Sequence, residues 1–232
     1  MNASLPTDFR ALVIGAGGAI GSAFVDTLRA DPRCAAVHAL SRDSDPPVDY
    51  GDEASIAAAA GRLRSIGPFH VIVVATGVLH TALAQPEKRL GDLNMAAMQQ
   101  VFLLNTFGPA LVLRHFAPLL DRQRSLMTLL SAKVGSIGDN RLGGWYTYRA
   151  SKAALNMMVK TASIEMRRTH PGAAIVAMHP GTVSSALSRP FRGDEIGRPA
   201  AQAAAEMWQA LQTLTPEDTG SFVAYDGQRL PW

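Results

Sequence analysis

Short apolar runs alternate along the chain with longer segments of helical length. The first five runs are rich in Val, Ile, Leu or Met and carry almost no charge, as strands buried on both faces of a sheet do. We expect the sixth run at an edge of the sheet. The runs predict strands at residues 10–15, 36–41, 70–76, 125–131, 173–179 and 220–225.

The intervals between these runs predict helices, which makes the pattern that of a parallel sheet covered on both faces. In the longest helical interval, Pro109 lacks a backbone donor, so we expect a bend there. No linker or internal repeat divides the chain, which predicts one domain over residues 1–232. The expected helices span residues 19–30, 53–65, 92–118, 145–169 and 199–213.

The composition is that of an ordinary globular protein, with 47% hydrophobic and 18% charged residues. The net charge of +3 comes from basic residues spread along the chain without interleaved aromatics, so we expect no nucleic-acid partner. The uncharged stretch at residues 11–25 is shorter than the roughly 20 residues of a membrane span and is interrupted by glycines. We therefore expect no membrane partner.

The single cysteine, Cys34, excludes an internal disulfide. Residues 1–10 lack the basic and apolar regions of a signal peptide. Both features favour a cytoplasmic location. The six histidines have no HExxH spacing and no cysteine partners, so we expect no metal site.

The segment "VIGAGGAIG" (13–21) follows the first expected strand and opens the first expected helix. Glycines there permit a tight turn, a close approach of the backbone to a pyrophosphate, and packing of helix on strand. The segment predicts a dinucleotide site in a doubly wound, Rossmann-type parallel sheet. The residues expected to form it are Gly15, Gly17, Gly18, Ala19, Ile20 and Gly21.

The second strand ends at Ser41 and Arg42, where the adenosine ribose of a bound dinucleotide would lie. Arg42 offers a positive charge to the 2′-phosphate of NADP, so we expect NADP(H) to be preferred, with NAD(H) possible. Asp49 has two alternative roles: it reaches the adenine edge, or it caps the helix that begins near Glu53.

Tyr148 and Lys152 stand four residues apart on an expected helix, so their side chains project from one surface. Ionising a tyrosine near neutral pH requires a pKa shift of about 3 units, or about 4 kcal/mol. One ammonium about 4 Å away supplies an energy on the order of 4 kcal/mol at an effective dielectric constant of 20. The spacing alone also fits an ordinary solvated helix face.

With its neighbours, the pair resembles a known family. "YRASK" (148–152), the glycine turn, Asn105 in "LLNTFG" and the segment "HPGTVSS" (179–185) together resemble the short-chain dehydrogenase/reductase family. The resemblance covers nearly the whole chain and is greatest to the C-factor-like and carbonyl-reductase-like branch.

The resemblance implies an oxidoreductase that interconverts a carbonyl and an alcohol on a small molecule. Tyr148 would be the general acid or base, Lys152 would lower its pKa and hold the cofactor ribose, and Asn105 would hold a water. Either Ser184 or Ser185 would contact the carboxamide end of the cofactor. The further cofactor-binding residues that it implies are Ala75, Thr76, Gly77, Pro180, Gly181, Val183 and Ser185, besides Tyr148 and Lys152.

The chain departs from the family at its catalytic serine. The family pattern SSxxG reads "SAKVG" (131–135) here, so Ala132 takes the place of the serine. Ser131 is assigned as the catalytic hydroxyl, and Ser136 is the alternative. Because losing one such donor costs about a hundredfold to a thousandfold in rate, a cofactor-binding sensor with little turnover is the second hypothesis.

We expect a mobile lid at residues 186–197, and Trp145, Leu142 and Met178 as further walls of the substrate pocket. The helices at 92–118 and 145–169 resemble those through which family members pair. A homodimer or homotetramer is therefore expected.

Overall fold

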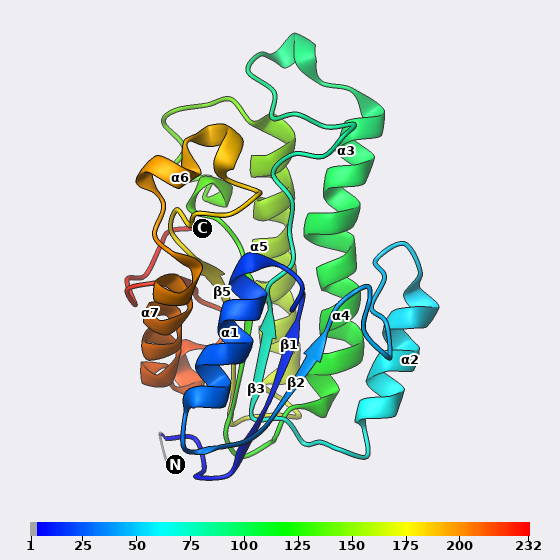
Figure 1. Cartoon of the computed structure of the whole chain (residues 1–232), viewed down its shortest axis with the longest axis vertical. Coiled ribbons are helices and arrows are strands. Elements are labelled where there is room, and N and C mark those ends of the chain that lie inside the picture. The colour runs from blue at the N-terminus through cyan, green and yellow to red at the C-terminus, as the bar shows by residue number, and fades with distance from the viewer. Residues whose placement is uncertain (1–3) are drawn as a thin grey trace.

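The structure, a computed structural model, describes residues 4–232, so residues 1–3 of the predicted domain and of the N-terminal segment lie outside the described residues. Figure 1 shows the arrangement of the helices and strands. In chain order they are β1 (Phe9–Ile14), α1 (Ala19–Ala30), β2 (Cys34–Leu40), α2 (Glu53–Leu63), β3 (Val71–Val74), α3 (Met95–Phe102), α4 (Gly108–Phe116), β4 (Ser125–Leu130), α5 (Tyr146–Met166), β5 (Ala173–His179), α6 (Gly193–Ile196), α7 (Ala200–Thr213) and β6 (Phe222–Ala224).

Within residues 4–232, six strands form one parallel sheet in the order β2-β1-β3-β4-β5-β6. The winding direction of the sheet reverses between β1 and β3, because the chain passes from β1 outward to β2 and then returns to β3. In doubly wound sheets, ligands bind at this reversal, beyond the carboxyl ends of the strands. The predicted α/β fold, a doubly wound parallel sheet of the Rossmann type, is confirmed.

The core lies on both faces of the sheet. Figure 1 shows α1 and α7 on one side and α2, α4 and α5 on the other. Phe24 and Met207 are fully buried on the first face, and Ile56, Phe116 and Val159 on the second. Burying a side chain of this size contributes about 1.5–3 kcal/mol, so the helices are held by their apolar faces.

The two outer strands differ from the central ones. β6 lies at an edge, as predicted. β2, which was expected to be buried on both faces, is the other edge, and most of its residues are only half-buried. Only β1 pairs with it, so solvent reaches one side of the strand.

The segment predicted as one long helix is divided into α3, a π-helical turn (Leu103–Phe107) and α4. In that turn the Gly108 N–H donates to the Leu103 carbonyl, five residues back. Pro109 has no N–H for the carbonyl four residues before it, which explains a widened turn rather than a simple bend. The segment Met95–Leu119 is long and apolar enough for a membrane span by composition, a property that buried core helices share.

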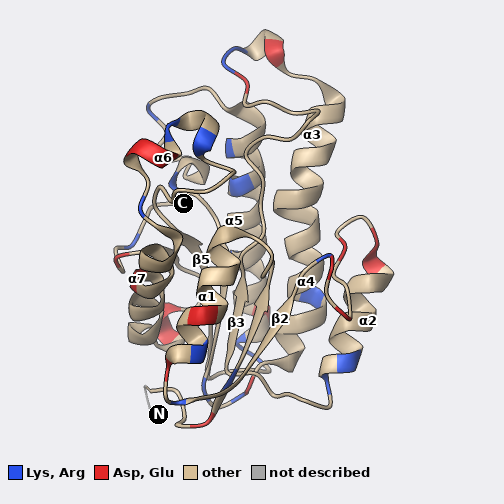
Figure 2. Cartoon of the chain, viewed as in Figure 1, with Lys and Arg blue, Asp and Glu red and all other residues tan. Residues whose placement is uncertain are grey.

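Figure 2 shows that the charged residues lie mainly on loops and helices, with the two signs interspersed. The strands around β3 are almost free of them. The interior of the sheet is therefore apolar. Side chains that could bind a ligand or react with it are expected at the ends of the strands and on the helices.

Candidate functional site

Two adjoining cavities lie at the carboxyl ends of the strands, one of about 310 Å³ and one of about 300 Å³. Thr76 and Gly77, directly after β3, line both of them. The first cavity continues over β4 and β5, and the second over β1 and β2. Together they form one cleft at the position where the winding of the sheet reverses.

The glycine turn after β1 has the form expected of a phosphate site. Gly15 has a φ of +90°, which favours glycine. A Cβ on Gly21 would lie 2.1 Å from the Gly15 carbonyl oxygen, so only glycine lets α1 approach β1 this closely. The N-cap of α1, Gly18, has no side chain to cover the first helical N–H groups, which leaves them available to an anion.

The turn residues take different positions around the cleft. Gly15, Gly17 and Gly18 line the second cavity and Ile20 lines the first, while Ala19 and Gly21 line neither. The absent Cβ atoms, the helix N-terminus and the cavity in front of them fit a dinucleotide pyrophosphate.

Ser41 and Arg42, just after β2, line the second cavity. Arg42 is exposed and pairs with no carboxylate among residues 4–232, whereas the nearby Asp45 is bound to Arg62 at 2.6 Å. Asp43, next to Arg42 in the chain, also lines this cavity, and it pairs with no cation among residues 4–232. The charged side chains at this end of the cavity are thus Arg42, Asp43 and Asp49, and the positive one is the guanidinium of Arg42.

The helix-capping alternative for Asp49 is wrong, and the contact with adenine stays a prediction. Asp52 caps α2, because its side chain accepts from the Ala54 N–H at 2.9 Å. Asp49 lines the second cavity, and its Oδ1 accepts from the Gly51 N–H at 2.8 Å. Its position beside the cavity agrees with the adenine alternative.

Tyr50 is a wall of the second cavity that the sequence argument missed. Its hydroxyl shares a hydrogen bond of 2.7 Å with the Thr76 hydroxyl, and its ring lies where a Cβ on Gly108 would stand. Burial raises the pKa of Tyr50, so it remains a neutral phenol. Only its place beside Asp49 in the sequence could have pointed to it.

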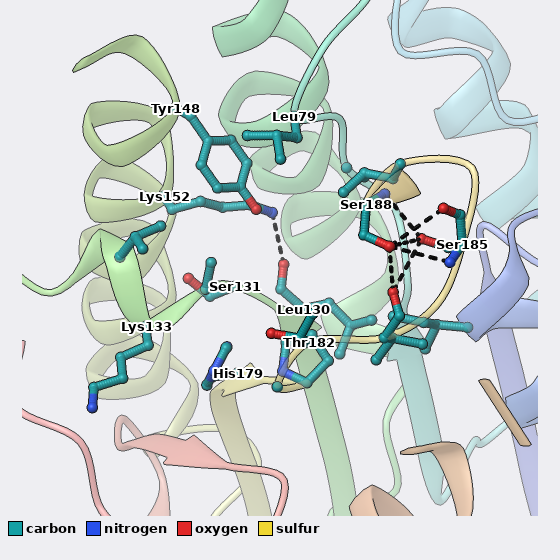
Figure 3. Close-up of a pocket in the computed structure, with 18 of the residues that line it drawn as sticks. Leu79, Leu130, Ser131, Lys133, Tyr148, Lys152, His179, Thr182, Ser185 and Ser188 are labelled. Atoms are coloured by element: carbon teal, nitrogen blue, oxygen red, sulfur yellow. Dashed lines mark hydrogen bonds between the residues drawn. The ribbon is translucent and has the colours of Figure 1, made fainter. Parts of the chain in front are cut away.

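Tyr148 and Lys152 project from α5 into the first cavity, as Figure 3 shows. The Lys152 Nζ donates to the Leu130 carbonyl at 2.9 Å. Burial raises the pKa of Tyr148 to about 12 and lowers the pKa of Lys152 to about 8. The predicted lowering of the tyrosine pKa is therefore absent in the chain alone, because loss of hydration penalises the phenolate.

Asn105 lies in the π-helical turn and is fully buried. Its Oδ1 accepts from the Val78 N–H at 2.8 Å, and its Nδ2 donates to the Val78 carbonyl and the Ser151 hydroxyl. A Cβ on Gly77 would lie 3.0 Å from the Lys152 Nζ and 3.3 Å from the Asn105 Oδ1. Asn105 thus fixes the loop after β3 against α5, while its role in holding a water stays a prediction.

Of the two candidate serines, only Ser131 lines a cavity. Its hydroxyl donates to the Asn156 Oδ1 at 2.6 Å, and Figure 3 shows it directed toward α5 rather than to the Tyr148 phenol. Ser136 is buried elsewhere and donates to the Trp232 carbonyl at 3.3 Å. Ala132 also lines the first cavity, so the family position is present without a hydroxyl.

The segment after β5 forms the opposite wall. Four predicted cofactor-binding residues of this segment line the first cavity: Pro180, Gly181, Val183 and Ser185. The predicted residue Ala75, which follows β3, lines it as well. Ser184 does not, because its hydroxyl donates to the Asp194 carboxylate at 2.8 Å. Ser185 is therefore the serine that borders the site.

The apolar end of the first cavity is walled by Trp145 and by Leu187, Phe191 and Ile196 of the expected lid segment. Trp145 stands edge-on to the rings of Tyr148 and Phe191, with centroids 6.1 and 5.3 Å away. The pocket thus has both aromatic and aliphatic walls near the Tyr148 phenol.

Two expected walls are corrected. Leu142 is 93% exposed and borders neither cavity, and Met178 points into the core, where it is fully buried. His179, one residue later on the strand, lines the cavity instead. Burial lowers the pKa of His179 to about 4, so its ring is neutral. Within residues 4–232, no group of three His, Cys, Asp or Glu residues could hold a metal ion.

Comparison with known proteins adds the family context. A family model described as enoyl-(acyl carrier protein) reductase matches residues 20–225. A 1-hydroxy-2-glutathionyl-2-methyl-3-butene dehydrogenase of Rhodococcus sp. is 32% identical over 81% of this chain and 80% of its own length. The C-signal protein of Myxococcus xanthus is 34% identical over 72% of this chain and 94% of its own.

Solved structures of similar fold include two carbonyl reductases. The carbonyl reductase Sniffer of D. melanogaster superposes with a TM-score of 0.83 at 20% identity, covering 97% of this chain and 100% of its own. The NADPH-bound carbonyl reductase from chicken fatty liver superposes at 0.82 and 24% identity, covering 100% of this chain and 97% of its own. At these identities the likeness extends to the fold.

Proposed function

Because this chain belongs to the short-chain dehydrogenase/reductase family of oxidoreductases, we propose that it interconverts a carbonyl and an alcohol on a small molecule, with NADP(H) as the preferred cofactor. The observation that carries the proposal is the joined cleft. A phosphate-type glycine turn and Arg42 lie at one end of it, and the buried Tyr148 and Lys152 lie at the other.

The cofactor would lie along this cleft. The glycine turn would hold the pyrophosphate, Ser41 and Arg42 the 2′-phosphate, and Pro180 to Ser185 the nicotinamide end. When bound, the nicotinamide supplies or accepts the hydride. The guanidinium of Arg42, which lines this end of the cleft and pairs with no carboxylate among residues 4–232, supports NADP(H) over NAD(H).

Tyr148 holds the proton that the reduced carbonyl oxygen needs. With a pKa of about 12 the phenol is protonated at neutral pH, so it would donate its proton to the carbonyl oxygen in reduction. In oxidation the phenolate form would take the proton of the alcohol. Lys152, with a pKa of about 8, is largely cationic at pH 7 and stabilises the phenolate that remains. The Leu130 carbonyl holds the ammonium in place.

The substrate would be a carbonyl or alcohol compound with an apolar body. The walls beyond Tyr148 are Leu79, Trp145, Leu187, Phe191 and Ile196, and such surfaces gain free energy by excluding water from an apolar ligand. A second candidate is a cofactor-binding sensor with little turnover. This candidate is favoured by two features: Ala132 has no hydroxyl, and the Ser131 hydroxyl donates its proton to Asn156 rather than to a substrate.

The test measures NADPH affinity by fluorescence and NADPH oxidation with a panel of aldehydes, ketones and quinones. Tyr148→Phe should lower turnover at least a hundredfold with unchanged NADPH affinity. The control is Tyr146→Phe, an exposed tyrosine on the same helix, which should keep wild-type turnover. Tight NADPH binding without turnover in wild type would support the sensor.

Arg42→Asp should lower the affinity for NADPH more than the affinity for NADH. Equal effects on the two affinities would contradict the proposed preference for NADP(H).

We propose further that copies of the chain pair through α4 and α5. Tyr146, Met157 and Ile164 are 39–64% exposed on α5, and their spacings of 11 and 7 residues put them on one face of the helix. Phe107, at the start of α4, is 50% exposed. A stripe of apolar side chains on a solvent-exposed helix face is typical of a contact between subunits.

A further inference from the structure

The helix that carries Tyr148 and Lys152 begins without a cap of its own. Its N-cap residue, Trp145, has a left-handed φ of +52° and makes no side-chain hydrogen bond to the first turn. The first turn also holds no acidic residue. The first N–H groups of a helix have no partner within the helix, and the positive end of the helix dipole favours a negative group beside them. A hydrogen-bond acceptor for α5 must therefore come from another part of the chain.

Glu87 supplies that acceptor from the loop between β3 and α3. Its carboxylate accepts from the Thr147 N–H at 3.1 Å and, through its other oxygen, from the Thr147 hydroxyl. Its backbone carbonyl accepts from the Trp145 N–H at 2.6 Å. Glu87 is only 5% exposed, which makes this a buried carboxylate bound to the start of α5 from 60 residues away.

The backbone at Trp145 and Thr147, which Glu87 binds, determines the position of two walls of the first cavity. Gly143 and Gly144, with φ of +63° and +64°, lead into Trp145, so three successive left-handed residues set the direction of α5. The indole of Trp145 then packs against the rings of Tyr148 and Phe191. A shift of the backbone at 145–147 would move both the phenol and the aromatic wall.

Glu87 itself lines neither cavity, so it does not touch a ligand in the cleft. We propose that Glu87 is a positioning residue: it caps α5 from outside the helix and thereby fixes the Tyr148 phenol and the Trp145 indole relative to the substrate. This proposal rests on the proposed function, because its effect on rate requires Tyr148 to be the proton donor.

The matched variants are Glu87→Ala and Glu87→Gln. Glutamine has the same shape, and its oxygen can accept from the Thr147 N–H while its NH₂ group donates to the Thr147 hydroxyl. Alanine removes both bonds. The control is Glu165→Ala, an exposed glutamate near the last turn of the same helix, which should match wild type in every measurement.

Three quantities are measured for each variant: kcat with the best carbonyl compound of the panel, the NADPH dissociation constant, and amide hydrogen exchange at residues 145–149. Glu87→Ala should lower kcat at least tenfold, since small misplacements of catalytic groups are costly. Its NADPH affinity should stay within twofold, because the glycine turn and Arg42 are remote. Exchange at Thr147 should accelerate at least tenfold, and Glu87→Gln should restore kcat and exchange to within threefold of wild type.

Unchanged kcat in Glu87→Ala would overturn the proposal, and so would a Glu87→Gln variant as impaired as alanine. If Glu87→Ala does not fold, Thr147→Val removes only the hydroxyl bond and should still lower kcat about threefold with NADPH affinity intact; no decrease would overturn the proposal. An inactive wild type would overturn the proposed function and with it the positioning role. Exchange at Thr147, measured without substrate, would then still decide whether Glu87 caps α5.

Discussion

At position 132 a methyl group borders the cavity that holds Tyr148 and Lys152. The neighbouring hydroxyl, that of Ser131, has one proton and donates it to Asn156. A carbonyl compound in this cavity would therefore meet the phenol of Tyr148 but no serine donor at position 132. Ser131 as a catalytic residue stays a prediction. Adjacent strand residues point in opposite directions, so a hydroxyl at position 131 does not stand where one at position 132 would.

Ala132→Ser should raise kcat for carbonyl reduction at least tenfold, because one well-placed donor is commonly worth about a hundredfold to a thousandfold in rate. Turnover of NADPH with the best compound of the panel measures the effect. Ser136→Ala, which changes a hydroxyl outside both cavities, should leave kcat unaltered. If Ala132→Ser brings no gain while Ser131→Ala slows turnover, Ser131 already provides the donor.

Among the elements, β1 and α1 pack together through a close approach of their backbones at Gly15 and Gly21. The missing Cβ of Gly21 lets the first turn of α1 lie on the Gly15 carbonyl. The neighbour there is backbone rather than a flexible side chain, so it cannot move aside locally. The spacing of the glycines in the sequence was sufficient to predict this packing.

Gly21→Ala should lower the free energy of unfolding by about 1–3 kcal/mol through overpacking and weaken NADPH binding at least tenfold. Gly61→Ala is the matched control: Gly61 lies in α2, and a Cβ there meets nothing within 4 Å. It should stabilise the protein by about 0.5–1 kcal/mol. Denaturant unfolding and NADPH titration measure both variants, and wild-type behaviour of Gly21→Ala would contradict the packing argument.

The segment 92–118 shows where an element could not be predicted in full. Its helical character was clear from composition, but the π-helical turn at Leu103–Phe107 was not. A proline explains why the hydrogen-bond pattern must change. The carboxamide of Asn105, bound to Val78 and Ser151, depends on contacts with two other segments, which local sequence does not encode.

For the whole molecule, the apolar stripe on α5 favours association of two or more copies. Ile164→Glu would place a charge in the proposed contact, and burying it unpaired would cost several kcal/mol. The variant should be monomeric in size-exclusion chromatography with light scattering at a concentration where wild type is oligomeric. Ile66→Glu, at an exposed position beyond the end of α2, should keep the wild-type mass; a monomeric wild type would contradict the pairing.

The order of strands and helices, the glycine turn and the Tyr148–Lys152 spacing were determined by the sequence by itself, because each depends on residues close together in the chain. Tertiary structure decided the rest. It made β2 an edge, brought Tyr50 to the cleft and bound Glu87 to the start of α5 across 60 residues. It also set the pKa values of Tyr148 and Lys152, since the hydration of a buried group depends on everything packed around it.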